Sequence, residues 1–177
     1  MLVASNTDPV FTRLDEELSK LGEARTLMVC GGTALIVLKV SDRATRDVDV
    51  VEPKIDPALK EIATRVGREF GLEDNWLNDG PSSLATELVN GWRARTVSIF
   101  AGRSLELRSL GRGDLLATKL YAFCDREDDF SDVLDLKPSK EELAGLFSWV
   151  LARDASSLWP KRVEECFARI RKSFGYE

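Results

Sequence analysis

Two adjacent glycines early in the chain stand where a protein backbone can bind phosphate. Gly31 and Gly32 follow the short apolar run of residues 27–30, and the apolar residues 33–40 come next. This order predicts a strand, a tight turn and a helix. Glycines let the backbone approach a ligand closely, and the N–H groups at the start of a helix attract an anion. The alternative is an ordinary strand-to-helix turn in which Thr33 is only the N-cap.

A pair of carboxylates follows in the run Asp47-Val-Asp-Val-Val51. The run predicts a strand, whose side chains alternate between two faces. Val48 and Val50 then point into the core, and Asp47 and Asp49 lie together on the opposite face. Two carboxylates so placed could share a hard divalent cation. The alternative is a charged face that protects an edge strand.

A third carboxylate, Glu106, lies in the second of two short predicted strands, residues 96–100 and 105–107. It stands between two leucines, so it faces away from whatever those leucines cover. Glu106 is therefore either the third member of the carboxylate site or a solvated strand residue.

Charged residues recur in the helical region that follows. Lys119 and Arg126 share one face of a helix predicted over residues 115–126, and Asp132 and Asp135 lie three positions apart on one face of the next segment. The two cations could bind phosphate, Lys119 as a point charge and Arg126 as a fork. They could instead pair with the aspartates and join two helices by ion pairs.

The elements that position these residues predict one α/β domain. The chain has 177 residues, of which 44% are hydrophobic and 31% are charged, as in a globular protein with one core. We expect an α/β part over residues 1–110 and a helical part over residues 111–177, with a loop at 75–81. Apolar spacing and capping signals predict the longer helices at residues 8–21, 58–70, 115–126, 139–151 and 160–174.

The composition excludes several kinds of chemistry. Histidine is absent, so a Ser-His-Asp or Cys-His nucleophile, a His general base and a His-ligated zinc are all excluded. The net charge of −5 argues against a protein that coats nucleic acid non-specifically. Three widely spaced cysteines predict reduced core thiols. No apolar run is long enough to cross a bilayer and no signal peptide is evident, so we expect a cytoplasmic protein without membrane contact.

Taken in this order, the residues resemble the nucleotidyltransferase superfamily, which has the DNA polymerase β-like fold. Its strand, glycine turn, helix and Asp-x-Asp strand match Gly31, Gly32, Asp47 and Asp49. The resemblance implies a small mixed sheet flanked by helices and an NTP whose phosphates are bound together with Mg²⁺, two ions being present during turnover.

The helical half carries a second resemblance. The run Lys119-x-x-Ala122-x-x-x-Arg126, followed by Asp132-x-x-Asp135-Leu136, resembles AbiEii-like toxins and related bacterial nucleotidyltransferases. Ser131 stands where those proteins often have a lysine.

The two resemblances together imply a Mg²⁺-dependent enzyme that transfers NMP from an NTP such as ATP to a hydroxyl on tRNA or protein. They also imply the toxin of a toxin–antitoxin system, with an antitoxin as partner. The alternatives are an inactive binding module of the same fold and an enzyme that modifies a small molecule such as an antibiotic. The implied metal ligands are Asp47, Asp49 and Glu106, which with Lys119 are also the implied catalytic residues. The implied nucleotide contacts are Gly31, Gly32, Thr33, Lys119, Arg126, Asp132 and Asp135.

Overall fold

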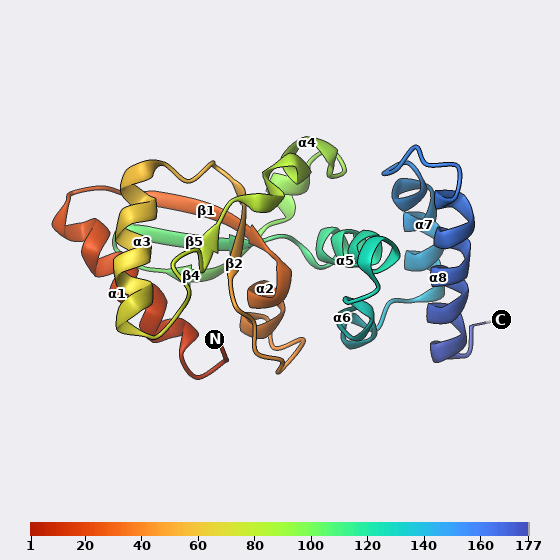
Figure 1. Cartoon of the computed structure of the whole chain (residues 1–177), viewed down its shortest axis with the longest axis horizontal. Coiled ribbons are helices and arrows are strands. Elements are labelled where there is room, and N and C mark those ends of the chain that lie inside the picture. Colours follow the sequence, from red (N-terminus) through yellow and green to blue (C-terminus); the bar gives the residue numbers. More distant parts are fainter. Residues whose placement is uncertain (177) are drawn as a thin grey trace. The chain divides into compact units, whose positions relative to one another are not determined.

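The computed structural model of the chain describes residues 1–176 (Figure 1). Two compact units are present: the first unit is Met1–Gly111, and the second unit begins at Arg112. The first unit contains a sheet with helices, and the second unit is helical. The predicted α/β class, with a mixed sheet and a helical C-terminal half, is confirmed.

The first unit is built on a mixed sheet of five strands in the order β3-β2-β1-β5-β4. The central strand β1 pairs antiparallel with β2 and parallel with β5. At the edges, β3 is parallel to β2 and β4 is antiparallel to β5. The strands are β1 (Arg25–Cys30), β2 (Val48–Glu52), β3 (Leu77–Asn78), β4 (Val97–Ala101) and β5 (Leu105–Ser109).

Two amphipathic helices cover one face of this sheet. They are α1 (Thr7–Lys20) and α3 (Pro57–Glu69), and their apolar stripes join the inward side chains of β1, β2 and β5 in one core. The proline at the start of α3 follows Asp56, whose carboxylate accepts a hydrogen bond from Leu59 N at 2.9 Å. An N-cap followed by proline fixes where the helix begins.

The remaining elements of the first unit are short and lie beside β2. Helix α2 (Gly31–Val37) begins directly at the glycines, and the structure places them inside its first turn. The 3₁₀ helix η1 (Gly80–Ser83) and helix α4 (Leu84–Glu87) contact β2, and the 3₁₀ helix η2 (Trp92–Arg95) precedes β4. Within residues 75–81, expected as a loop, Leu77 and Asn78 form β3 and Gly80 begins η1, while residues 75, 76 and 79 lie outside helices and strands.

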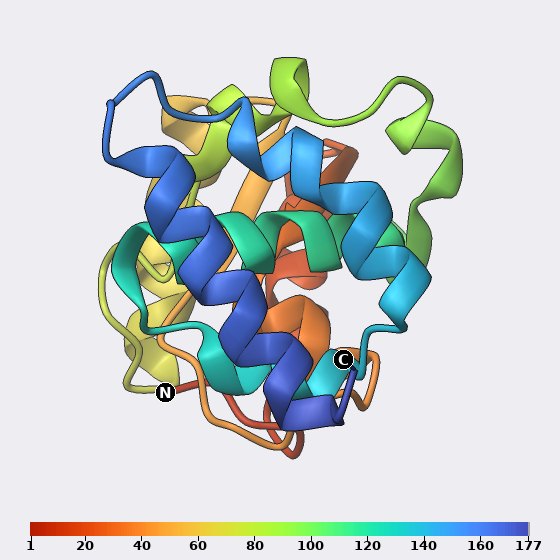
Figure 2. The same ribbon diagram turned by 90° about the vertical axis from the view of Figure 1, so that its right-hand side faces the viewer.

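The described part of the second unit, residues 112–176, contains four helices. Helices α7 and α8 run side by side and cross α5, as Figure 2 shows. The predicted capping box at the start of α7 is present, because Ser139 Oγ accepts from Glu142 N and the Glu142 carboxylate accepts from Ser139 N. The helices are α5 (Arg112–Arg126), α6 (Phe130–Leu136), α7 (Lys140–Leu151) and α8 (Trp159–Phe174).

Candidate functional site

The glycine turn and the second aspartate meet where β1 ends and β2 begins. Cys30, the last residue of β1, is the register partner of Asp49. A Cβ atom on Gly31 would lie 2.4 Å from Asp49 Oδ2, and Gly31 has a φ of +74°. Position 31 therefore requires glycine for two reasons, the left-handed backbone and the nearby carboxylate. The glycine turn and the Asp49 carboxylate therefore lie directly against each other.

Asp47 is fixed by two threonine hydroxyls. Thr33 Oγ1 donates to the Asp47 backbone oxygen at 2.7 Å, and Thr45 Oγ1 donates to Asp47 Oδ1 at 3.4 Å. Gly32 belongs to the same arrangement, since a Cβ there would lie 2.8 Å from Thr45 Oγ1. Thr33 itself is fully buried, so its hydroxyl joins α2 to the aspartate segment and has no surface for a nucleotide. Nor is Thr33 the N-cap, a position that Cys30 occupies.

Asn78 is a contact of Asp49 that the sequence did not reveal. In the register of β2 and β3, Asn78 is the partner of Asp49. Its Nδ2 donates to Asp49 Oδ1 at 3.2 Å. The only signal for this strand was the apolar pair Trp76-Leu77, which is too short to show a period.

Glu106 lies on the expected face of the sheet but near the start of β1, whereas Asp49 lies near the end of that strand. Leu105 and Leu107 are in the core, so Glu106 and Asp49 both face away from it. Glu106 is the register partner of Thr26, four residues before Cys30. At about 3.3 Å per residue, Glu106 is roughly 13 Å along the sheet from the partner of Asp49.

An arginine already neutralises Glu106, because Arg108 Nη1 donates to Glu106 Oε1 at 2.7 Å. Within residues 1–176, no three His, Cys, Asp or Glu side chains form a group that could hold a metal ion. The expectation that Glu106 completes the aspartate pair is therefore not met. The alternation of side chains along the strand predicted the correct face of the sheet for Glu106. The position of Glu106 relative to Asp49, however, depends on how β1 pairs with β5.

The cations of the second unit form a buried cluster with aspartates, called here the Lys119 cluster and made up of Lys119, Arg126, Asp129 and Asp132. Lys119 Nζ lies 2.7 Å from Asp129 Oδ1 and 2.6 Å from Asp132 Oδ2, with its side chain 10% exposed. Arg126 Nη2 lies 3.2 Å from Asp129 Oδ2. The structure therefore shows the alternative in which Lys119 forms an ion pair with Asp132 and joins two helices. Asp129 is a further partner that spacing alone did not select.

The electrostatics of the Lys119 cluster keep both kinds of group charged. Burial by itself lowers the pKa of Lys119, but hydrogen bonds and charge from the two aspartates outweigh it and the pKa is raised. Burial alone would raise the pKa of Asp129, yet Lys119 and Arg126 bring it below its ordinary value. Arg126 differs from Lys119 because 62% of its side chain is exposed. Asp135, the other predicted contact, is half-buried on α6.

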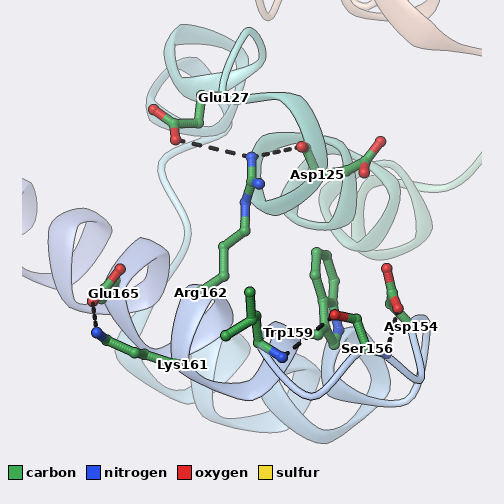
Figure 3. Close-up of a pocket in the computed structure, with 9 residues that line it drawn as sticks. Asp125, Glu127, Asp154, Ser156, Trp159, Lys161, Arg162 and Glu165 are labelled. Carbon is green, nitrogen blue, oxygen red and sulfur yellow. Dashed lines mark hydrogen bonds and ion pairs between the residues drawn. The ribbon is translucent and has the colours of Figure 1, made fainter.

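A pocket of about 460 Å³ in the second unit has none of the predicted site residues in its lining. Figure 3 shows the two cations of its lining, Lys161 and Arg162, each beside a carboxylate. Arg162 Nη2 donates to the Asp125 backbone oxygen at 2.6 Å and lies 3.9 Å from the Glu127 carboxylate. Lys161 Nζ lies 3.7 Å from Glu165 Oε1. Four carboxylates and two cations line the pocket, and both cations already have partners within the lining, so we assign the pocket no ligand.

Comparison with known proteins yields one family. The family model described as "Nucleotidyltransferase of unknown function (DUF6036)" matches residues 10–149. That range contains the glycine turn, the aspartate pair, Asn78 and the Lys119 cluster. No curated protein and no solved structure gives a significant match. Among the described residues, the helices are too short or too polar for any of them to span a bilayer.

Proposed function

Because the chain belongs to the family of nucleotidyltransferases of unknown function (DUF6036), we propose that it transfers NMP from an NTP to a hydroxyl acceptor with the help of Mg²⁺. The observation that carries this proposal is the meeting of the glycine turn with the aspartate pair. Gly31 lies against the Asp49 carboxylate, and Thr33 and Thr45 hold Asp47 beside it. In the proposed reaction, the acceptor hydroxyl attacks the α-phosphorus of the NTP and pyrophosphate leaves.

The donor set of this site fits a hard divalent cation. Asp47 and Asp49 offer carboxylate oxygens, which Mg²⁺ prefers over nitrogen or sulfur. The space left by the missing Cβ of Gly31 lies directly against Asp49 Oδ2, so the Gly31 backbone comes close to this carboxylate. Asp47 and Asp49 would therefore hold the ion. When bound, Mg²⁺ would supply positive charge for the reacting phosphate and lower the pKa of the attacking hydroxyl.

The other predicted site residues have distinct proposed roles. The backbone N–H groups of Gly31 and Gly32 would contact the outer phosphates of the NTP. Arg126, largely exposed at the end of α5, is the proposed fork for a phosphate group. Lys119 is neutralised by two aspartates, so in this proposal it holds α5 to α6 and fixes the helix that carries Arg126.

We propose tRNA or a protein as the source of the acceptor hydroxyl, and we propose that the protein acts as the toxin of a toxin–antitoxin pair. This part of the proposal rests on the resemblance of the Lys119–Leu136 run to AbiEii-like toxins. It predicts that the wild type slows the growth of a bacterial host and that Asp47→Ala relieves the effect. Equal growth of the two strains would refute the toxin role and leave the transfer reaction untouched.

The enzymatic proposal is tested by incubating the protein with Mg²⁺, each α-labelled NTP in turn, and either total RNA or cell lysate. Wild type should label an acceptor with at least one NTP, and Asp49→Asn should not. The matched control is Asp42→Asn, an exposed aspartate in the preceding loop, which should label like wild type. Full labelling by Asp49→Asn would refute the metal assignment. Binding of an NTP without any consumption would favour the inactive binding module.

A further inference from the structure

We propose that Asn78 is the positioning residue for Asp49, holding the carboxylate in the orientation in which it binds the divalent cation. This inference rests on the proposed function and adds a residue to its site. The added residue places a neutral amide beside Asp49, whereas the sequence suggested a third carboxylate.

Asn78 lies beside Asp49 because the two residues before it, Trp76 and Leu77, are packed in the core. Trp76 is fully buried, and its Nε1 donates to Ala63 O in α3 at 2.7 Å. A Cβ on Gly67 of α3 would lie 2.5 Å from the Trp76 ring, so this glycine admits the indole. Leu77 is also in the core. The two-residue strand β3 is thereby held against β2 at the position of Asp49.

The orientation of the Asn78 amide follows from its second partner. Asn78 Oδ1 accepts a hydrogen bond from Gly80 N at 3.0 Å. Because Oδ1 faces Gly80, the Nδ2 group at the other end of the amide faces Asp49. Nδ2 can only donate, and it donates to Asp49 Oδ1. Both ends of the side chain are thus occupied, so Asn78 has one orientation in which both hydrogen bonds are made.

Asp49 is consequently held from two sides. Asn78 donates to Oδ1, and the backbone of Gly31 lies against Oδ2. An N–H donor fixes a carboxylate without adding negative charge beside Asp47. Ligating carboxylates in metal sites are usually hydrogen-bonded in this way, and loss of such a partner typically weakens metal binding or activity about 10–100-fold.

The test measures Mn²⁺ binding by the electron paramagnetic resonance of the free ion, together with the thermal unfolding midpoint of each variant. The key variant is Asn78→Leu, which keeps the shape of the side chain and removes its donor. We expect Asn78→Leu to bind Mn²⁺ about 10–100-fold more weakly than wild type. A variant that binds Mn²⁺ as tightly as wild type would overturn the inference.

Two controls separate positioning from folding. Leu77→Ala damages the packing of β3 without touching Asp49, so it should lower the unfolding midpoint and leave Mn²⁺ affinity of the folded protein unchanged. Asn75→Ala, in the exposed part of the same segment, should change neither. If Leu77→Ala weakens Mn²⁺ binding as much as Asn78→Leu does, the effect belongs to the strand and the inference fails.

The proposed function is tested separately by Asp49→Asn in the same assay. If the wild type binds Mn²⁺ and Asp49→Asn does not, the metal site stands, and only the result for Asn78→Leu decides the role of Asn78. If the wild type binds no Mn²⁺, the metal site of the proposed function and this inference are both refuted.

Discussion

The substitution Gly31→Ala tests the centre of the site because it adds one methyl group at a known place. The new Cβ would lie 2.4 Å from Asp49 Oδ2, whereas ordinary contacts of carbon begin near about 3.5 Å. The carboxylate would have to retreat by about 1 Å, and a misplacement of that size at a reacting site can cost about 100-fold in rate. The φ of +74° adds a backbone cost of roughly 1–2 kcal/mol for a residue other than glycine.

The backbone cost can be measured alone at Gly22. This residue has a φ of +68°, and no atom lies within 4 Å of its added Cβ. Gly22→Ala should therefore lose roughly 1–2 kcal/mol of stability in urea denaturation and keep its kcat/KM for the NTP. Gly31→Ala should lose at least as much stability and about 100-fold in kcat/KM. Wild-type kcat/KM for Gly31→Ala would refute the claim that the turn and Asp49 form one site.

Three further predictions concern the parts that support the site. Lys119→Met removes the cation that pairs with two buried carboxylates, Asp129 and Asp132, and should destabilise the protein by about 3–5 kcal/mol in urea denaturation; a loss below about 1 kcal/mol would contradict the burial. Thr33→Val removes the hydroxyl that holds Asp47 and should cost about 1 kcal/mol with reduced NTP turnover, and unchanged turnover would refute its supporting role. Burial alone would raise the pKa of Asp15, but N–H donors in residues 103–105 outweigh it and lower the pKa. The ionised Asp15 carboxylate should therefore stabilise the folded protein above a pH of about 4. This stabilisation should be lost as the pH falls through the lowered pKa of Asp15 in the folded state. Asp15→Asn should be about 1–3 kcal/mol less stable than wild type at pH 7, with a smaller difference in acid, and an equal difference at both pH values would contradict this.

The sequence predicted the features that depend on neighbours along the chain. The strand before Gly31, the helix after it and the alternation around Asp49 are local patterns, while the approach of Gly31 to Asp49 depends on the pairing of β1 with β2. The capping box of α7 was predicted for the same reason. In each case, a few consecutive residues determine both the backbone conformation and the direction of the side chains.

The features that depend on pairing between distant segments could not be predicted in this way. Glu106 is on the expected face, but its distance from Asp49 depends on the register of two strands far apart in the sequence. Asn78 lies in a strand of two residues that exists because Trp76 is anchored in α3. Lys119 was placed correctly on its helix, while its burial and its contact with Asp129 depend on how α5 packs against α6.

The central claim is nucleotidyl transfer, and the fate of the two ends of the triphosphate tests it most directly. The measurement compares α-labelled and γ-labelled NTP with wild-type protein, Mg²⁺ and cell lysate. The account predicts that the α-label becomes attached to a macromolecule, that the γ-label leaves as pyrophosphate, and that Asp49→Asn abolishes both changes. Attachment of the γ-label, or equal attachment of the α-label by Asp49→Asn, would contradict it.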